Sequence, residues 1–198
     1  MKYVNQLKYP NMLYVTRTEM DEKNKEWGRT STIKSSGCGL CAAIMVADRL
    51  LPEYQFDLDD ALALAYESGA NRKRGTSYAC FGPAFAEKMG LKMEATKDVE
   101  ALRNCLRTGG AAVILVDGDR DGKVGLFTHS GHFMAIINEE TDGRFAILDP
   151  SLSATKYEEE GRKGRVEIRN GVIVLADGKT LEEETANRAT PFYLFWRA

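Results

Sequence analysis

The sequence predicts an α+β fold, because its helix patterns come first along the chain and most of its strand patterns come later. Helix signals cover residues 38–51, 58–68, about 83–89 and 99–108. Short apolar or β-branched runs follow at 111–116, 133–137, 145–148, 166–169, 172–175 and 192–196. Strands gathered in this way, rather than alternating with helices, predict an antiparallel sheet.

The first two predicted helices have clear boundaries. The first opens at Cys38 and stops at Pro52, which cannot continue a helix. Its segment 40–46 is apolar on nearly every face, so we expect a buried central helix. Asp57 is suited to cap the second helix, and Gly69 lies just past its end.

The next two helices are shorter. Pro83 favours the first turn of the third helix, and Gly90 closes it. Gly109 and Gly110 end the fourth helix. One face of that helix is apolar and carries Val99, Leu102, Cys105 and Leu106. The first 37 residues are extended and rich in turns, and we expect the charged segment 19–25 to be an exposed loop.

Turn residues separate the predicted strands. The run 111–116 is rich in β-branched residues and indicates a buried strand. A polar turn at 138–143 joins the next two runs. Asn170-Gly171 separates two further runs and is a strong hairpin signal. The last run, 192–196, is an aromatic strand.

Length and composition limit the possible functions. A chain of 198 residues predicts a single domain over 1–198. The net charge of −2 does not suggest nucleic acid or an anionic membrane as a partner, and no apolar run approaches a membrane span. No signal peptide is visible, which predicts a cytoplasmic protein, although non-classical export remains open. The four cysteines do not form a disulfide framework, and the oligomeric state stays undetermined.

Three residues could form a cysteine nucleophile with its base. Cys38 follows a polar turn at a helix start, where unpaired N–H groups favour the thiolate. His132 begins a strand that would hold its ring, and Asp149 ends the next strand. Each also has an ordinary structural explanation: a packed thiol, a strand-end histidine and an Asp-Pro turn. Together they predict a site in which Asp149 orients His132, which serves Cys38.

These residues resemble the papain-like cysteine peptidases of the bacteriocin-leader-processing type and their C39-like relatives. The family's Cys-Gly motif opening the central helix is matched by Cys38-Gly39. Its Gly-His-Phe strand is matched by Gly131-His132-Phe133, and its Asp-Pro at the next strand's end by Asp149-Pro150. Residues 85–91 resemble its helix ending in Gly-Leu, and 102–116 its helix, glycine turn and strand. The likeness covers about residues 1–150.

The resemblance implies a papain-like fold, with the cysteine's helix packed on a C-terminal antiparallel sheet. It implies a cysteine peptidase that needs no cofactor and acts on peptides or proteins, with small residues before the cut. The family's oxyanion-hole glutamine usually lies shortly before the cysteine. Here the only glutamine before Cys38 is Gln6, 32 residues upstream. Gln6 and the Cys38 amide are the candidates for that role.

Several alternatives remain open. The same fold could cleave peptidoglycan stem peptides as an endopeptidase or amidase, or bind peptides without turnover. The pattern from Cys38 to Cys41 also fits a C-x-x-C redox motif, although the segment before it is polar rather than a buried strand. Without hydrolysis, the fold would be a peptide-binding module.

Two metal-binding patterns are weaker. A zinc set of Cys38, Cys41, His129 and His132 has 87 residues between its pairs and a short His-x-x-His spacing. Residues 117–122 match the first half of a calcium loop, but its twelfth position is Thr128 instead of glutamate. We therefore predict no metal.

Overall fold

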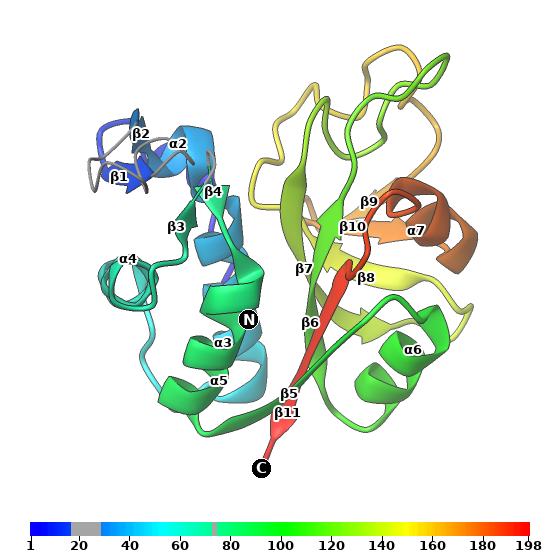
Figure 1. The fold of residues 1–198 in the computed structure, drawn as a ribbon. Helices are drawn as coiled ribbons and strands as arrows, with labels where there is room; N and C mark the ends of the chain where they lie inside the picture. Colours follow the sequence, from blue (N-terminus) through cyan, green and yellow to red (C-terminus); the bar gives the residue numbers. More distant parts are fainter. Residues whose placement is uncertain (17–28, 73–74) are drawn as a thin grey trace.

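The computed structural model describes residues 1–16, 29–72 and 75–198. The chain forms a helical half and a sheet half that lie side by side (Figure 1). Helices α3 (Cys38–Leu50), α4 (Leu58–Glu67) and α5 (Tyr78–Met89) form most of the first half. This half also holds η1 (Gln6–Lys8), α2 (Ile33–Ser36) and two small sheets, β1 (Leu13–Thr16) with β2 (Arg29–Thr32) and β3 (Asn71–Arg72) with β4 (Gly75–Thr76).

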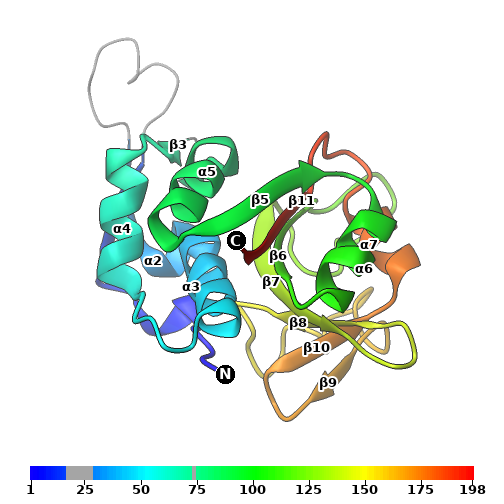
Figure 2. The same ribbon diagram turned by 90° about the horizontal axis from the view of Figure 1, so that it is seen from below.

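The second half is built on a seven-stranded antiparallel sheet in the order β5-β11-β6-β7-β8-β10-β9. Its strands are β5 (Leu91–Thr96), β6 (Ala111–Val116), β7 (His132–Glu139), β8 (Phe145–Leu148), β9 (Glu167–Arg169), β10 (Ile173–Ala176) and β11 (Phe192–Arg197). Two helices, α6 (Val99–Arg107) and α7 (Gly178–Glu184), complete this half. Figure 2 shows that β5, the edge strand next to β11, follows directly after α5, so it links the two halves.

Helices cover both faces of the central strands. α3 packs on β6 and β7, whereas α6 contacts β6, β7 and β11. Successive side chains of a strand point to opposite faces. Val113 and Phe133 accordingly lie in the core shared with α3, and Ile114 and Met134 lie in the core shared with α6. This two-sided burial explains why these strands read as continuous apolar runs.

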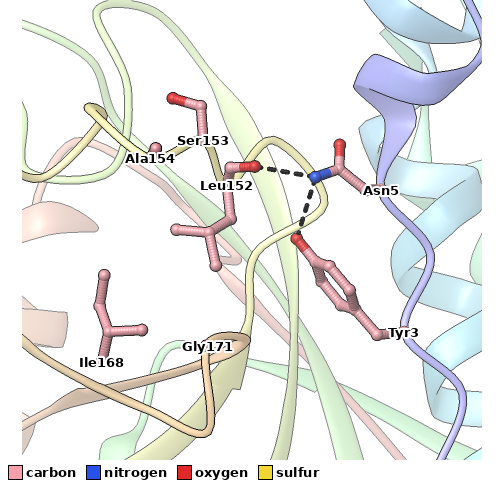
Figure 3. A pocket seen from close by; sticks show the side chains of 7 residues that line it. All are labelled: Tyr3, Asn5, Leu152, Ser153, Ala154, Ile168 and Gly171. Carbon is pink, nitrogen blue, oxygen red and sulfur yellow. Dashed lines mark hydrogen bonds between the residues drawn. The ribbon is translucent and has the colours of Figure 1, made fainter.

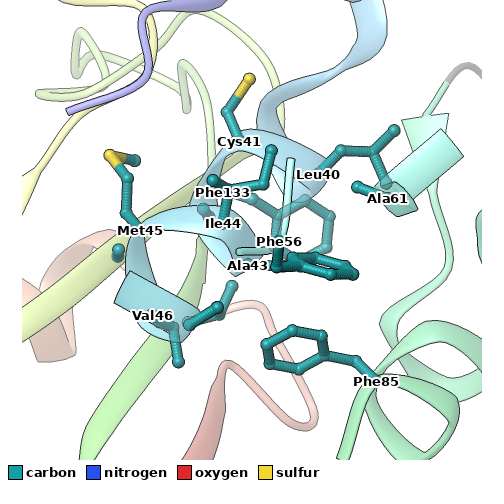
Figure 4. Close-up of a cluster of buried hydrophobic side chains, with 14 of the residues drawn as sticks. Leu40, Cys41, Ala43, Ile44, Met45, Val46, Phe56, Ala61, Phe85 and Phe133 are labelled. Carbon is teal, nitrogen blue, oxygen red and sulfur yellow. The ribbon is translucent and has the colours of Figure 1, made fainter. Parts of the chain in front are cut away.

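Helix α3 is buried along most of its length, as predicted. Figure 4 shows its residues Leu40 to Val46 surrounded by apolar side chains of other elements. Phe56 and Phe85 pack against each other with ring centroids 5.4 Å apart, beside this helix. Because the cluster holds α3 from several directions, the first residue of the helix has a fixed position relative to the sheet.

The structure confirms an antiparallel mixed fold and most of the predicted elements, with boundary shifts of a few residues. One predicted helix start is wrong. The sequence favours Pro83 in the first turn of the third helix, but in the structure this helix, α5, begins at Tyr78 with Ser77 as its N-cap, so Pro83 lies inside it. A proline there removes one backbone hydrogen bond. Burial of Tyr78 and Phe81 offsets that loss.

Several elements were not predicted from the sequence. Strand β5 is missed because most of its residues are not buried, so its hydrophobic pattern is weak. Helix α7 is only seven residues long, and its N-cap Asp177 accepts a hydrogen bond from the Thr180 amide. The predicted exposed loop at 19–25 lies outside the described residues. None of the helices within the described part of the chain is long and apolar enough to cross a bilayer.

Candidate active site

Cys38 is the first residue of α3 and is half-buried. Gly37 separates it from α2, and the Cys41 amide donates to the Gly37 carbonyl at 3.0 Å. The first amides of a helix have no partner within the helix, so the thiol lies where a negative charge is stabilised. Backbone hydrogen bonds from Phe133 and Gly39 also reach the sulfur.

His132 and Asp149 come together because β7 and β8 are neighbours. β7 begins at His132, and β8 ends one residue before Asp149. The antiparallel pairing of these strands brings the two side chains side by side, with His132 Nε2 2.8 Å from Asp149 Oδ1. This leaves Nδ1 for the hydrogen bond between the His132 ring and the Cys38 thiol.

The electrostatics of this contact favour an ion pair. Burial opposes ionisation of Cys38, but the hydrogen bond and charge of His132, with backbone amides, outweigh it and lower the pKa of the thiol. Burial also opposes a charged His132, but the Asp149 carboxylate, with the Cys38 hydrogen bond, raises the pKa of the ring. The two shifts have opposite signs, which widens the pH range in which thiolate and imidazolium coexist.

Asp149 is fully buried and has more partners than the sequence predicted. Its Oδ1 accepts from the Ser151 amide at 2.9 Å, and its Oδ2 accepts from Lys156 Nζ at 2.5 Å and from the Tyr157 hydroxyl at 2.8 Å. Burial opposes its ionisation, but the charges and hydrogen bonds of Lys156 and His132 hold the pKa of Asp149 far below its usual value. It is therefore a carboxylate at any pH near neutrality.

Sequence reasoning missed Ser151, Lys156 and Tyr157. The Ser151 hydroxyl lies 3.0 Å from His132 Nε2 and 3.1 Å from Asp149 Oδ1. A serine two residues after an aspartate is a local turn signal that could have identified it. Lys156 and Tyr157 lie in a stretch with turns only and no periodic pattern, so no local signal identifies them.

Gln6 forms hydrogen bonds with two segments that flank the site. Its backbone amide donates to the Pro150 carbonyl at 2.7 Å, and its side-chain Nε2 donates to the Lys34 carbonyl at 2.7 Å. Gln6 is buried, and among the described residues none donates a hydrogen bond to its Oε1. The fold thus brings this N-terminal residue beside α2, which precedes Cys38, despite the distance in sequence.

Two other cysteines, Cys41 and Cys105, lie in environments that favour the neutral thiol. All four cysteines are free. Burial and then the charge at Cys38 raise the pKa of Cys41, which makes it a poor partner for dithiol redox chemistry. Burial raises the pKa of Cys105 to about 11.

Residues of the two possible metal-binding patterns form other ion pairs and hydrogen bonds. Asp117 pairs with Arg188 at 2.8 Å, and Asp119 accepts from the Gly125 amide at 2.9 Å. His129 lies between Asp119 and Glu159, at 2.9 Å from each. Across residues 1–16, 29–72 and 75–198, no three His, Cys, Asp or Glu side chains are grouped so as to hold a metal ion.

A cavity of about 310 Å³ adjoins the chain that follows Asp149. Asn5 Nδ2 donates to the Leu152 carbonyl at 2.8 Å and contacts the Tyr3 hydroxyl, as Figure 3 shows. That hydroxyl in turn donates to the Asp149 carbonyl at 2.6 Å. The N-terminal segment therefore braces the Asp149 turn. Seven residues line the cavity: Tyr3, Asn5, Leu152, Ser153, Ala154, Ile168 and Gly171.

Solved structures share this architecture at low sequence identity. A protein assigned to the C39-like peptidases, from Bacillus anthracis, matches with a TM-score of 0.57 and 11% identity over 100% of this chain and 94% of its own. The peptidase domain of Streptococcus ComA, a bi-functional ABC transporter involved in a quorum-sensing pathway, matches with a TM-score of 0.51 and 14% identity, over 81% and 91%. No protein-family model matches the sequence, and no curated protein matches it.

The chain therefore has the fold of the C39-like, papain-like peptidases. In this fold the helix that begins at Cys38 packs on the sheet that carries His132.

Proposed function

We propose that residues 1–198 form a single C39-like cysteine peptidase domain that hydrolyses a peptide bond through Cys38, His132 and Asp149. One observation carries the proposal: His132 is hydrogen-bonded to Cys38 and, through Nε2, to the buried Asp149 carboxylate at 2.8 Å. A nucleophile, a base and a group that orients the base are the three parts that acyl transfer needs.

The first half of the reaction forms a thioester. The Cys38 thiolate attacks the peptide carbonyl carbon, and the S–C bond forms as the carbonyl oxygen takes up negative charge. His132 then gives its Nδ1 proton to the nitrogen of the leaving amine as the C–N bond breaks. Throughout this step His132 Nε2–H donates a hydrogen bond to Asp149, which keeps the ring in place.

The second half releases the acid product. A water molecule gives a proton to His132 while its oxygen attacks the thioester carbon, and the S–C bond breaks to regenerate the Cys38 thiolate. The developing oxyanion needs hydrogen-bond donors. The Cys38 amide, at the N-terminus of α3, and the Gln6 side chain are the proposed donors, and the position of Gln6 beside α2 supports this role.

The proposed substrates are peptides or proteins with small residues before the cut. This preference follows from the resemblance to the C39-like family alone. The fold shared with a peptidase domain of a quorum-sensing transporter supports a peptide substrate in general.

A quenched fluorescent peptide library with small residues before the scissile bond tests the proposal. We expect Cys38→Ala to lower hydrolysis by at least about a thousand-fold, because no other group replaces the nucleophile. Cys80→Ala is the matched control and should retain activity. Cys80 is also half-buried, but among the described residues its thiol is hydrogen-bonded only to the Ser77 hydroxyl. Hydrolysis that survives in Cys38→Ala at the wild-type rate would contradict the assignment.

A further inference from the structure

Lys156 is a buried cation placed behind the proposed catalytic pair. Only 8% of its side-chain surface is exposed. Its Nζ donates to Asp149 Oδ2 at 2.5 Å and to the Ser151 hydroxyl at 2.6 Å, and it lies 5.6 Å from the centre of the Tyr157 ring. It therefore contacts the carboxylate oxygen that His132 does not use.

The site thus contains four charged groups, each in contact with the next, whose signs alternate. The order is the Cys38 thiolate, the His132 imidazolium, the Asp149 carboxylate and the Lys156 ammonium. When all four are ionised, the buried cluster is neutral as a whole. Without Lys156 the cluster would carry a net negative charge, which is costly away from water.

The proton transfers proposed above make this compensation necessary. After His132 gives its proton to the leaving amine, Asp149 faces a neutral ring. A fully buried carboxylate without a cation would then draw a proton and lose its ability to accept from His132 Nε2. Lys156 is the cation that stays in contact with Asp149 at that stage.

We propose that Lys156 is a positioning residue, whose ammonium keeps Asp149 an ionised and oriented acceptor for His132 while His132 gains and loses its proton. This inference rests on the proposed function and deepens it. Lys156 touches neither the peptide bond nor the nucleophile in this scheme and acts through Asp149.

The electrostatic effects on Lys156 show that its burial disfavours the charged form of its own side chain. Burial lowers the pKa of Lys156, the charge of Arg162 also lowers it, and the charges of Asp149 and Cys38 act in the opposite direction. Besides these groups, Tyr157 and Ser151 face the ammonium. The ring of His132, for its part, faces Cys38, Asp149 and Lys156. The net effect lowers the pKa of Lys156, so its burial is not explained by stabilisation of its own charge.

The test measures the rate at which iodoacetamide alkylates Cys38, followed by mass spectrometry of its peptide, as a function of pH. The profile has an acid step where Cys38 ionises and an alkaline step where His132 loses its proton. In Lys156→Met both steps should move to higher pH, and the alkaline step should move by about one unit because Lys156 contacts Asp149 directly. The thiolate loses a nearby cation, and deprotonation of His132 would leave Asp149 with none.

Two further variants complete the design. Lys156→Arg keeps the charge and should return both steps to within about 0.3 pH units of the wild type. Lys163→Met makes the same substitution at an exposed lysine a few residues away and should leave the profile unchanged. Lys156→Gln keeps a hydrogen-bond donor without the charge, and it should behave as Lys156→Met does.

The proposal is overturned if Lys156→Met or Lys156→Gln leaves the steps in place or moves the alkaline step to lower pH. It is also overturned if both neutral variants fail to fold while Lys156→Arg folds, because Lys156 would then serve the architecture alone. Alkylation requires no turnover. A wild-type protein that cleaves no peptide would therefore contradict the proposed function and leave this test intact.

Discussion

At the scale of single residues, the environment of each cysteine decides its chemistry. Cys38 and Cys41 are one helical turn apart in α3, yet their pKa values shift in opposite directions. Burial opposes ionisation of both. Only Cys38 has the hydrogen bond and charge of His132 to overcome that burial. A thiol buried in an apolar core without such a partner stays protonated and is therefore unreactive.

Selective alkylation near pH 6 follows from this difference. We expect iodoacetamide to label Cys38 at least about ten-fold faster than Cys80, because thiolate is the reactive form and the pKa of Cys38 is lowered. Cys41 and Cys105, whose pKa values are raised, should label slowest. Peptide mapping after short exposures measures the four rates. Equal rates at Cys38 and Cys80 would contradict an activated thiolate.

The same shifts fix the sign of the pH dependence of hydrolysis. Activity should fall on the acid side as Cys38 takes up its proton, below the ordinary range for a thiol. It should fall on the alkaline side as His132 loses its proton, above the ordinary range for histidine. Asp149 does not limit activity in this window, since its pKa lies far below it.

At the scale of elements, the junction of α2 and α3 sets the position of the nucleophile. The Gly37 amide donates to the Ile33 carbonyl at 2.9 Å, and a Cβ added at Gly37 would lie 2.7 Å from that same oxygen. The φ angle of Gly37 is −91°, so the requirement is steric and not conformational. Glycine here allows α2 to end directly against the start of α3.

Gly37→Ala should therefore disturb the site. The new methyl group forces α2 or the first turn of α3 to move, and we expect hydrolysis to fall by about ten- to a hundred-fold, with a stability loss of about 1–3 kcal/mol. Peptidase assays and urea unfolding measure the two effects.

Gly90→Ala is the matched control for this substitution. Gly90 has a φ of +62°, and a Cβ there meets nothing within 4 Å, so alanine costs stability through strain without crowding. Folded Gly90→Ala should keep its activity, because Gly90 ends α5. Among the described residues, its amide donates hydrogen bonds to carbonyls of α5 and not to Cys38, His132 or Asp149. Full activity in Gly37→Ala would show that the junction tolerates displacement.

At the scale of the whole molecule, a buried carboxylate ties the loop before His132 and the loop after Asp149 to α7. Glu184 is fully buried, and its Oε1 pairs with Arg120 at 3.2 Å and with Arg165 at 3.1 Å, while its Oε2 accepts from the Leu126 amide at 2.8 Å. Arg120 and Leu126 belong to the loop before His132, and Arg165 belongs to the segment after Asp149. Figure 1 shows both loops at the same end of the sheet half, near α7.

Removing this charge should destabilise the protein as a whole. We expect Glu184→Gln to lower the free energy of unfolding by about 3–5 kcal/mol, because Arg120 and Arg165 lose a buried partner. Chemical unfolding measures the change. Glu182→Gln, on the exposed side of the same helix, should change stability by less than about 0.5 kcal/mol. Equal stability of the two variants would mean that Glu184 contributes little.

Local sequence patterns determined much of the fold. The apolar face of α6 was predicted residue by residue, from Val99 to Leu106, because helical periodicity is a local property. β6 and β8 match their predicted ranges, since β-branched or apolar runs bounded by turn residues need no distant information. The order of Cys38, His132 and Asp149 along these elements predicted the candidate site.

Only the tertiary structure decided which distant groups meet. Packing against the core extends α5 back to Tyr78, and pairing with β11 forms β5 from a weak pattern. Lys156 reaches Asp149, and Gln6 reaches Lys34, through contacts that no spacing encodes. The sequence by itself therefore determined the thiol at a helix start, because caps and periodicity are local. The charges that surround this thiol depend on how the halves pack.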